Sequence, residues 1–442
     1  MAADVTATPP PRAHSDPLPP DSMPGCALPG TPLAGALPGI NACVHCGFCL
    51  QACPTYLNLE DENDSPRGRI FLMRSLLEGT VAPDDASVQQ HIDQCLGCRA
   101  CEPVCPSGVP YGQLLEATRA TLYQYRPTPF IARLILFVFA RQWLLRPAMF
   151  LSRLLAATPI PTLLSGIQGR LGFAMAMLAS TGRSIERGRY NPVMRGERGQ
   201  VAMLRGCVME GLFTTTNRAT ERVLAVNGYS LVGAPGQRCC GALHAHAGHL
   251  DAARDLARRN IAAFEKSGAA FIAVNAAGCG AIMKEYGHLL RDDRDWHERA
   301  VAMSARVRDV SELLAAAGPR EGGPLPIKVT YDAPCHLQHA QRVTEPPLSM
   351  LAAIPGLELV PLHDSDQCCG SAGIYNLIEP DTSDAVLAPK LANIRATRAP
   401  WVATGNPGCL MQIGAGLIRA EIAARSIHPV DLLDASYAAF GQ

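Results

Sequence analysis

The chain has 442 residues, of which 48% are hydrophobic, and its formal net charge is zero with a pI near 7.1. That length exceeds one ordinary core, so two or three domains are expected. The absence of a basic excess excludes electrostatic nucleic-acid binding, because no surplus cations are available to neutralise phosphates.

Residues 1–38 are rich in proline and contain no apolar core of the signal-peptide type. This composition predicts a disordered leader and a chain that stays in the reducing cytoplasm. The chain has 17 cysteines, and clustered cysteines in that compartment usually hold metal. Cys26 stands alone in the leader, and we assign it no role.

Two cysteine runs follow, each of the form C-x2-C-x2-C-x3-C-P and offset by 52 residues. The runs are Cys43, Cys46, Cys49, Cys53 and Pro54, then Cys95, Cys98, Cys101, Cys105 and Pro106. Such a run indicates a bacterial-type ferredoxin with two 4Fe-4S clusters, in which the fourth cysteine of each run ligates the other cluster. The expected ligands are Cys43, Cys46, Cys49 and Cys105 for cluster I, and Cys95, Cys98, Cys101 and Cys53 for cluster II. The alternative is a pair of structural zinc sites, although zinc favours separated C-x-x-C pairs.

The segment between the runs predicts a helix from Ser65, a capping residue, to Gly79, which ends it. A short helix then leads into the second run, so residues 39–125 are expected to form an all-α two-cluster module. Arg67 and Arg69 either screen cluster charge, or are simply solvated or paired with Asp or Glu. The second interpretation is favoured, since such ion pairs are common.

Residues 126–200 are expected to be an apolar helical connector followed by a polar linker at 180–200. Segment 126–178 is the most apolar part of the chain, but arginines interrupt it and Pro147 breaks any single helix, so no run reaches 18 apolar residues. The interrupting arginines are Arg133, Arg141, Arg146 and Arg153. The connector either packs on a domain or partner, or lies on a membrane surface with its arginines reaching lipid phosphates. Packing is favoured because the arginines do not line one helical face.

From Val201 onward, short β-like segments alternate with helical ones, which predicts two repeated α/β units with mainly parallel sheets, at 201–324 and 325–442. The strands expected in the first unit are 201–207, 229–235 and 269–279, with helices at 217–228 and 250–268. The same order returns at 327–335, 348–356, 357–362, a helical 384–398, and 401–409. Cysteines mark both units at offsets of 128 to 130 residues, namely Cys207, Cys239, Cys240 and Cys279, then Cys335, Cys368, Cys369 and Cys409. Because each follows a strand or begins a helix, four thiols can converge in each unit, and we hypothesise a metal or redox site there.

The spacings C-x31-CCG-x37-C and C-x32-CCG-x38-C resemble the CCG (cysteine-rich) domains of the heterodisulfide reductase-like family. A helical two-cluster ferredoxin followed by two CCG domains resembles the iron–sulfur subunits of glycolate oxidases, also called glycolate dehydrogenases. The segments "SPRGRI", "CCGALHAHAGH", "DAPCHLQHAQ" and "GNPGCLMQI" carry the resemblance, which covers about residues 40–440. It implies an α/β protein with an N-terminal all-α ferredoxin-like module and two repeated CCG domains.

The chain departs from heterodisulfide reductase, because Ile282 and Gln412 stand where a fifth cysteine would complete each C-x-x-C. This argues against that enzyme's non-cubane cluster and against disulfide reduction, while four thiols still suffice for a conventional cluster. Histidines near these sites are expected to cap or pack rather than to ligate metal: His244, His246, His249 and His336. Tyr286, Tyr331 and Tyr375 are expected to be core or rim aromatics.

We find no G-x-G-x-x-G, G-x-x-x-x-G-K-[ST] or G-x-S-x-G motif, so we expect no flavin or nicotinamide on this chain and assign no catalytic residue. The resemblance implies FAD-binding oxidase subunits that oxidise glycolate to glyoxylate, with electrons passing through this chain to a membrane quinone or another acceptor. The expected location is the cytoplasm, or peripherally the inner face of the cytoplasmic membrane. Two alternatives stay open: an equivalent subunit for lactate or glycerol 3-phosphate oxidation, and a thiol–disulfide oxidoreductase.

Overall fold

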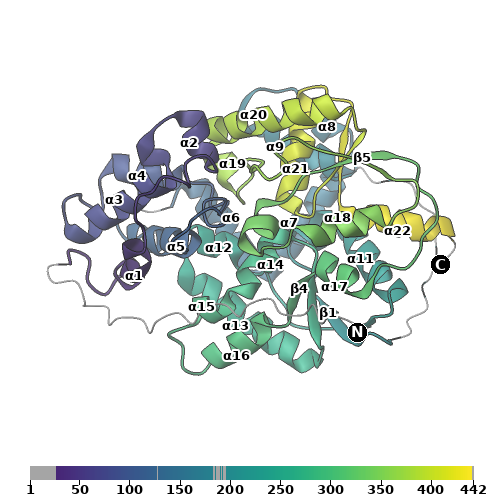
Figure 1. The fold of residues 1–442 in the computed structure, drawn as a ribbon, viewed down its shortest axis with the longest axis horizontal. Coiled ribbons are helices and arrows are strands. Elements are labelled where there is room, and N and C mark those ends of the chain that lie inside the picture. Colours follow the sequence, from purple (N-terminus) through teal and green to yellow (C-terminus); the bar gives the residue numbers. More distant parts are fainter. Residues whose placement is uncertain are drawn as a thin grey trace, which may run out of the picture.

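The computed structural model describes residues 26–126, 128–182, 185, 190, 192 and 196–440. Its N-terminal helices form a lobe at the left of Figure 1, and the two α/β units fill the lower and the upper right parts. Residues 1–25 of the predicted leader and most of the predicted linker at 180–200 lie outside the described residues.

The N-terminal lobe is entirely helical, as its sequence predicts. Its elements are η1 (Ala34–Ala36), α1 (Leu37–Asn41), α2 (Pro54–Leu59), η2 (Glu62–Asp64), α3 (Pro66–Glu78), α4 (Ala86–Asp93) and α5 (Tyr111–Leu122). The expected signals bound α3: the Ser65 side chain accepts a hydrogen bond from the Gly68 N–H, and Gly79 ends the helix with a φ of 72°.

The end of the predicted leader differs from expectation, because residues 26–38 are ordered. Leu28, Leu33 and Leu37 are buried against the core of the N-terminal lobe, and the Ala27 N–H donates to the Leu77 carbonyl at 2.8 Å. Composition alone could not show this, because the segment is rich in proline and glycine. Burial of its three leucines nevertheless stabilises it against the lobe.

The connector contains α6 (Phe130–Ala140), α7 (Gln142–Ala156), α8 (Ile160–Leu164) and α9 (Gly169–Thr181). Helix α9 packs on α21 of the second α/β unit, and α7 packs on α10 of the first. Among the described residues no single helix meets the length and hydropathy expected of a bilayer span, and only α6 and α7 taken together do, across a bend of 107°.

The first α/β unit is built on a parallel four-stranded sheet in the order β2-β1-β3-β4. Ala202 in β1 pairs with Val232 on one side and Ile272 on the other. Its elements are β1 (Gln200–Met203), α10 (Val208–Leu212), α11 (Thr214–Val226), β2 (Ser230–Val232), α12 (Ala242–His246), α13 (Leu250–Ser267), β3 (Phe271–Val274), α14 (Ala277–Lys284), α15 (Tyr286–Leu289), α16 (His297–Ser304), β4 (Val307–Asp309) and α17 (Val310–Ala317).

The second unit repeats this topology in a parallel sheet of order β6-β5-β7-β8. Its elements are β5 (Lys328–Tyr331), a π-helical turn η3 (His336–Ala340), α18 (Glu345–Ala352), β6 (Glu358–Val360), α19 (Tyr375–Ile378), α20 (Pro380–Thr397), β7 (Trp401–Ala403), α21 (Pro407–Arg419), β8 (Arg425–Ile427) and α22 (Pro429–Phe440). The repeat predicted from the cysteine offsets is thus a repeat of whole folding units.

The two α/β units share one core. Helix α22 of the second unit lies beside α11 of the first (Figure 1), where the Asn227 side chain donates to the Tyr437 hydroxyl and Arg222 pairs with Asp434 at 2.6 Å. A single buried apolar cluster runs from Val201 and Val223 to Val329 and Leu433. The two units are therefore held in one fixed arrangement.

Candidate functional site

Both N-terminal cysteine runs form loops with the same unusual backbone. Residues between the first and second cysteines, and between the second and third, adopt positive φ in each run: His45 at 53°, Gly47 at 86°, Gly97 at 62° and Arg99 at 64°. These positions are related by the 52-residue offset. Left-handed residues alternating with the others turn successive N–H groups toward one side, which makes a concavity suited to anionic sulfur. The loops therefore have the shape that a cluster of negative charge requires.

A small cavity of about 30 Å³ collects the four cysteines expected for cluster I. Cys43, Cys46 and Cys49 come from the first run, and Cys105 comes from the second. Cys101 also reaches this cavity, so the two predicted ligand sets adjoin each other. Burial raises the pKa of the Cys49 thiol to about 11, so a bound cation is needed to hold it as thiolate at neutral pH.

The cysteines expected for cluster II lie deeper, around Arg69. This arginine is fully buried, and negative charge on Cys95 or Cys53 would stabilise its positive form. Cys95 and Cys101 belong to the same buried cluster, and burial, with the charges of Cys95 and Cys53 contributing, raises the pKa of the Cys101 thiol. Cys98 lies on the side that faces the second α/β unit. Arg69 thus lies among these thiols as the cationic half of a buried ion pair with Asp64.

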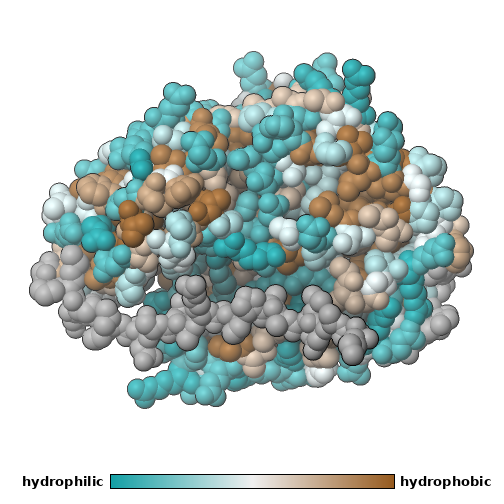
Figure 2. All heavy atoms as spheres, viewed as in Figure 1, coloured by the Kyte–Doolittle hydropathy of each residue, from teal (hydrophilic) through white to brown (hydrophobic). Residues whose placement is uncertain are grey.

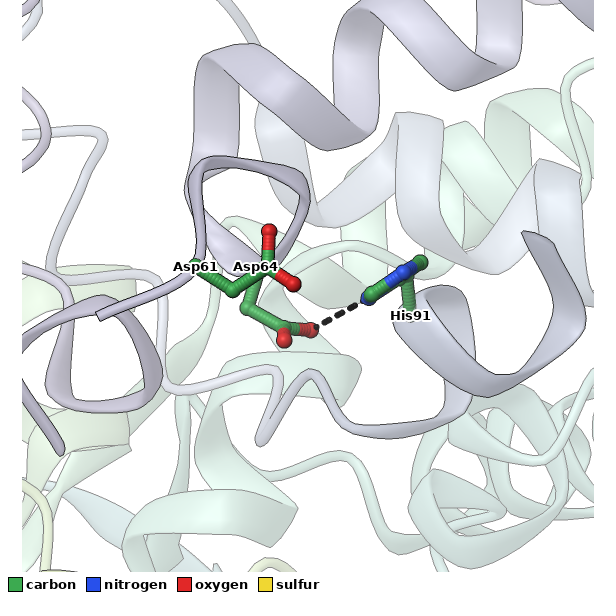
Figure 3. A group of neighbouring side chains, drawn as sticks. All are labelled: Asp61, Asp64 and His91. Atoms are coloured by element: carbon green, nitrogen blue, oxygen red, sulfur yellow. Dashed lines mark hydrogen bonds and ion pairs between the residues drawn. The ribbon is translucent and has the colours of Figure 1, made fainter. Parts of the chain in front are cut away.

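Asp61, Asp64 and His91 approach closely enough to suggest a metal site (Figure 3). Their polar atoms are already used: Asp64 Oδ1 lies 3.0 Å from Arg69 Nη2 and 3.2 Å from His91 Nδ1, while Asp61 caps η2 by accepting from the Asn63 N–H. The guanidinium already neutralises the buried carboxylate, so this group holds Arg69 in place rather than a metal ion.

In the first α/β unit the four cysteines meet at the carboxyl ends of the strands. Cys207 follows β1, Cys239 and Cys240 follow β2, and Cys279 follows β3 in the first turn of α14. The sulfurs of Cys207 and Cys239 are 3.7 Å apart, and those of Cys240 and Cys279 are 3.1 Å apart. The Tyr286 hydroxyl donates to the Cys240 carbonyl at 2.7 Å and fixes the loop.

The second unit gathers its cysteines in the same way. The sulfur of Cys335 lies 4.0 Å from that of Cys368, and the sulfur of Cys369 lies 3.3 Å from that of Cys409. The hydrogen bond with Cys369, together with burial, raises the pKa of the Cys409 thiol, while the Asn406 amide donates to the Cys409 sulfur. In the first unit, by contrast, the hydrogen bonds with Cys207 and Cys240 lower the pKa of the Cys239 thiol. Four thiols gathered in each unit are suited to a cation that would take them as thiolates.

The positions where a fifth cysteine is missing are filled by packing and hydrogen bonds. Ile282 lies in the core of the first unit. The Gln412 side chain is fully buried, donates to the Ser383 hydroxyl and accepts from the Asn376 amide. Neither residue is a cluster ligand, so four sulfurs per unit remain.

The histidines near the thiols all have other partners. His244 contacts the Leu136 carbonyl at 3.1 Å, His246 contacts Glu116 at 3.0 Å, and His249 contacts the Thr128 hydroxyl at 2.9 Å. His336 contacts the Gly97 carbonyl at 3.0 Å, in the loop of the second cysteine run. Tyr286, Tyr331 and Tyr375 are buried core aromatics.

The N-terminal lobe and the two α/β units meet at these thiols. Cys98 belongs to one buried cluster with Cys368, and Cys335 packs against it. On the other side of Cys335, His336 approaches Gly278 so closely that a Cβ there would lie 3.4 Å from its Nδ1. Gly278 precedes Cys279 of the first unit. The four thiol groups therefore form one continuous series through the molecule.

Sequence reasoning missed a large cavity of about 1020 Å³ that opens beside Cys207 and Cys239. Its wall is assembled from α6, α7, α10 and the loops after β1 and β2, which are far apart in the sequence. No local pattern could have indicated it, because the wall forms only where these separate segments pack together.

Comparison with known families assigns both halves of the chain. Residues 39–109 match the 4Fe-4S dicluster domain, and residues 201–284 and 329–414 each match the cysteine-rich CCG domain. The first match shows an iron–sulfur domain rather than a pair of zinc sites. The two later matches confirm the predicted repeat of α/β units.

Three curated proteins illustrate the similarity. The chain is 39% identical over 411 residues to the probable glycolate oxidase iron–sulfur subunit of Bacillus subtilis, covering 88% of this chain and 92% of that protein. It is 37% identical over 381 residues to the glycolate oxidase iron–sulfur subunit of Escherichia coli, covering 84% and 88%. It is 28% identical over 237 residues to lactate utilization protein A of Geobacillus thermodenitrificans, covering 53% of this chain and 98% of that protein.

Proposed function

The chain belongs to the family of glycolate oxidase iron–sulfur subunits, and from that premise we propose that it carries electrons from an FAD-binding subunit that oxidises glycolate to glyoxylate to a membrane quinone. The observation that supports this proposal is the continuous series of thiol groups from the N-terminal lobe through the second α/β unit to the first. A flavin exchanges electrons singly or in pairs, so an FAD partner matches single-electron carriers to a two-electron oxidation.

Two 4Fe-4S clusters in the N-terminal lobe would supply single-electron transfer. We assign Cys43, Cys46, Cys49 and Cys105 to cluster I, and Cys95, Cys98, Cys101 and Cys53 to cluster II. The cavity that gathers the first set supports the assignment, since it joins Cys105 to the three cysteines of the other run. The left-handed loops would direct N–H groups at the sulfurs of both clusters.

The CCG units are proposed to hold at least one further iron–sulfur centre on Cys207, Cys239, Cys240 and Cys279, on Cys335, Cys368, Cys369 and Cys409, or on both sets. Buried thiols beside one another support a cationic occupant. Their place in the series supports a redox role, because Cys335 and Cys368 adjoin Cys98.

The FAD-binding subunit is proposed to dock over cluster I. Cys46 is exposed, and three large apolar side chains beside the cysteine runs are open to solvent: Val44 at 67%, Phe48 at 66% and Val104 at 42%. Figure 2 shows apolar groups gathered over this N-terminal lobe. Exposed apolar side chains around the outermost redox centre favour a protein partner there.

The opposite partner is proposed to be an anionic membrane surface bound by α6 and α7. Eight large apolar side chains of these helices are exposed, namely Phe130, Ile131, Leu134, Phe137, Trp143, Phe150, Leu151 and Leu154. Between Thr128 and Gly182 the chain has five arginines and no Asp, Glu or Lys. An apolar face flanked only by arginine matches a bilayer of anionic lipid better than it matches solvent.

The test of the relay uses the full chain purified without oxygen. Iron and sulfide are measured, and the EPR spectrum is recorded after addition of glycolate, lactate or glycerol 3-phosphate, with and without the FAD-binding subunits. We expect glycolate to reduce the clusters only with the partner present. Reduction by glycolate without any partner would refute the relay, and reduction only by lactate with its own partner would change the substrate.

The ligand assignments are tested in the same preparation by cysteine-to-serine changes. Serine at Cys239, Cys240, Cys368 or Cys369 is expected to lower the iron content and remove part of the EPR signal. About eight iron atoms per chain, unchanged by these substitutions, would restrict the clusters to the N-terminal lobe.

Lactate is the second candidate substrate, because lactate utilization protein A matches part of the chain. That match spans 53% of this chain, whereas the glycolate oxidase subunits match 84 to 88%. The longer match favours glycolate.

A further inference from the structure

The cavity beside Cys207 and Cys239 is much larger than the cavity that gathers the cysteines of cluster I. Its volume, about 1020 Å³, is at the upper end of the range that ligand pockets usually have. Cys207 follows β1 and Cys239 follows β2, so the cavity lies at the carboxyl ends of a parallel sheet, where ligands usually bind in such folds. Cys207 and Cys239 belong to the thiol group of the first α/β unit, and this group is the last of the four when the series is counted from cluster I.

One wall of the cavity is the inner side of the proposed membrane helices. Leu145, Met149 and Phe150 of α7 line it together with Phe139 of α6 and Leu256 of α13. Phe150 is also 57% exposed, so it belongs both to the cavity wall and to the apolar outer face. The cavity wall and the face proposed to contact the bilayer therefore meet at Phe150.

The cavity also carries positive charge that is not balanced by its own acids. Arg146 and Arg238 line it and form no hydrogen bond or ion pair through their side chains with another described residue. The carboxylates in the wall, Glu210 and Glu221, are both paired with Arg218, and Glu221 also lies 3.9 Å from Arg205 of the wall, so neither pairs with Arg146 or Arg238. The cavity therefore has an apolar side at α7 and unpaired guanidiniums at Arg146, which is exposed, and Arg238, which is half-buried. Such guanidiniums favour a ligand with carbonyl oxygens that gain negative charge on reduction.

The matching thiols of the second unit lie in a different environment. Cys368 is packed against Cys98 and Leu96 of the N-terminal lobe, and Cys369 and Cys409 are packed beneath α9. The two repeated units therefore differ in what surrounds their thiols. Those of the second unit lie against the N-terminal lobe, and Cys207 and Cys239 of the first unit lie beside an open cavity.

We propose that this cavity is the quinone site of the relay, with the quinone ring beside Cys207 and Cys239 and its carbonyl oxygens hydrogen-bonded by Arg146 and Arg238. The proposal rests on the electron-transfer function proposed above. The quinone takes two electrons, which come from glycolate through the FAD-binding subunit and would be delivered one at a time by the iron–sulfur centres that the thiol groups hold, and two protons from water in the open cavity, and it leaves as the quinol. Its isoprenoid tail lies along the apolar side of α7.

The first test is photolabelling by an azidoquinone in anionic vesicles that hold the full chain with its FAD-binding subunits. Label is expected on peptides from α7, α10 and the loop after β2. Gly233 lines the cavity, and a Cβ at this position meets nothing within 4 Å, so Gly233→Trp fills the cavity without displacing backbone. It is expected to lower labelling about tenfold or more. Gly166→Trp is the matched control, because Gly166 has the same open space and does not line the cavity.

The second test removes charge. Arg238→Gln is expected to weaken quinone binding about tenfold, the usual loss for a hydrogen bond from a charged group. Arg259→Gln removes an exposed arginine of the same unit outside the cavity and is expected to change nothing. Iron content and circular dichroism establish that each variant is folded and loaded.

Reduction of the clusters by glycolate is recorded by EPR in the same samples and does not require quinone. Clusters that fail to reduce contradict the proposed function, while the labelling still locates the quinone. Normal cluster reduction with unchanged labelling and quinone reduction in Gly233→Trp and Arg238→Gln would overturn the site. Displacement of the label by a small disulfide, but not by unlabelled quinone, would also overturn it and would indicate a thiol substrate.

Discussion

Arg67 and Arg69 stand two positions apart on α3 and have opposite environments. Arg67 is partly exposed and pairs with Glu62 at 2.6 Å. Arg69 is fully buried and donates to the Asp64 side chain, the Thr55 hydroxyl and the His91 carbonyl. The sequence favoured arginines that are solvated or paired with Asp or Glu, and both are paired, but only Arg67 is exposed as that interpretation assumed. It could not show that one pair is buried against cysteines, because that depends on the packing of α2 and α4 around α3.

Replacing Arg69 by methionine is expected to destabilise the N-terminal lobe by about 3–5 kcal/mol, because Asp64 is left as a buried charge without its main partner. The measurement is the urea midpoint followed by circular dichroism and by loss of visible cluster absorbance. Midpoints are compared, since a chain with several domains and bound metal does not unfold in two states.

Arg67→Met is the matched control on the same helix and is expected to cost at most about 1 kcal/mol, because its ion pair is exposed to solvent. The double variant Arg69→Met with Asp64→Leu is expected to recover much of the stability, since it removes both buried charges. If it were as unstable as Arg69→Met alone, the buried pair would not be the cause.

The left-handed conformation of four residues in the cysteine runs could be predicted from residue type at only two of them. Gly47 and Gly97 are consistent with positive φ, but His45 and Arg99 give no sequence signal for it. Arg99 is fixed by ion pairs with Glu102 and with Glu285 of the first α/β unit. The conformation of the run is therefore partly set by a domain that lies far along the chain.

At the level of elements, the connector has one side packed on the protein and one apolar side that is exposed, as expected of packing and of membrane contact respectively. Ala132, Leu136 and Leu145 are buried on the protein side. Trp143, Leu151 and Leu154 fall on one face of α7 because they are separated by eight and three residues, and all three are exposed. Packing was favoured over membrane contact, yet it covers only one side of these helices.

The triple change Trp143→Ser, Leu151→Ser and Leu154→Ser is expected to lower binding to anionic vesicles roughly tenfold or more, because three apolar side chains no longer enter the lipid. Sedimentation with vesicles measures this. Folding should be unaffected, since these side chains are already solvent-exposed and none lines the large cavity.

Val301→Ser with Phe440→Ser is the control, because both side chains are exposed outside the connector, at 49% and 56%. High salt is expected to weaken binding of the native chain, through screening of the arginines. Equal binding of the triple variant and the control would show that α7 does not contact lipid.

The short edge strands were harder to predict than the helices. Strands β4 and β8 have three residues each and were not expected from the sequence. Their identity as strands comes from pairing with β3 and β7, since three residues carry too little pattern to show a period of two. Longer segments with turn residues on both sides, such as α13 and α20, were predicted to within a few residues.

At the scale of the whole molecule, His428 joins the two α/β units. Its Nδ1 accepts from the Val430 N–H, and its Nε2 lies 3.0 Å from the Asn275 carbonyl of the first unit. Only the neutral ring with hydrogen on Nε2 satisfies both partners. Burial lowers the pKa of His428 to about 4.

Because the folded-state pKa of His428 lies below the unfolded value of 6.5, the unfolded chain takes up a proton that the folded chain resists. Stability is therefore expected to fall as the pH drops from 6.5 to about 4, by about 3 kcal/mol for this group, and to lose no more below that. His428→Gln is expected to reduce this dependence, which urea midpoints at a series of pH values would measure.

His363→Gln is the control for the pH series, because the His363 side chain is 79% exposed and lies at the surface. Its midpoints should follow those of the native chain at every pH. A His428→Gln profile as steep as the native one would mean that acid acts elsewhere.

The sequence by itself determined the four groups of cysteines, the helical N-terminal lobe and the repeated α/β units. Those features are local or periodic: cysteine spacing, helix caps, and strand–helix alternation at a fixed offset. Only the tertiary structure decided which group faces which. It places Cys98 against Cys368, His336 beside Gly278, and α7 over the cavity at Cys207 and Cys239. These contacts join segments more than fifty residues apart, and they are selected by the packing of whole surfaces, which no single segment of the sequence records.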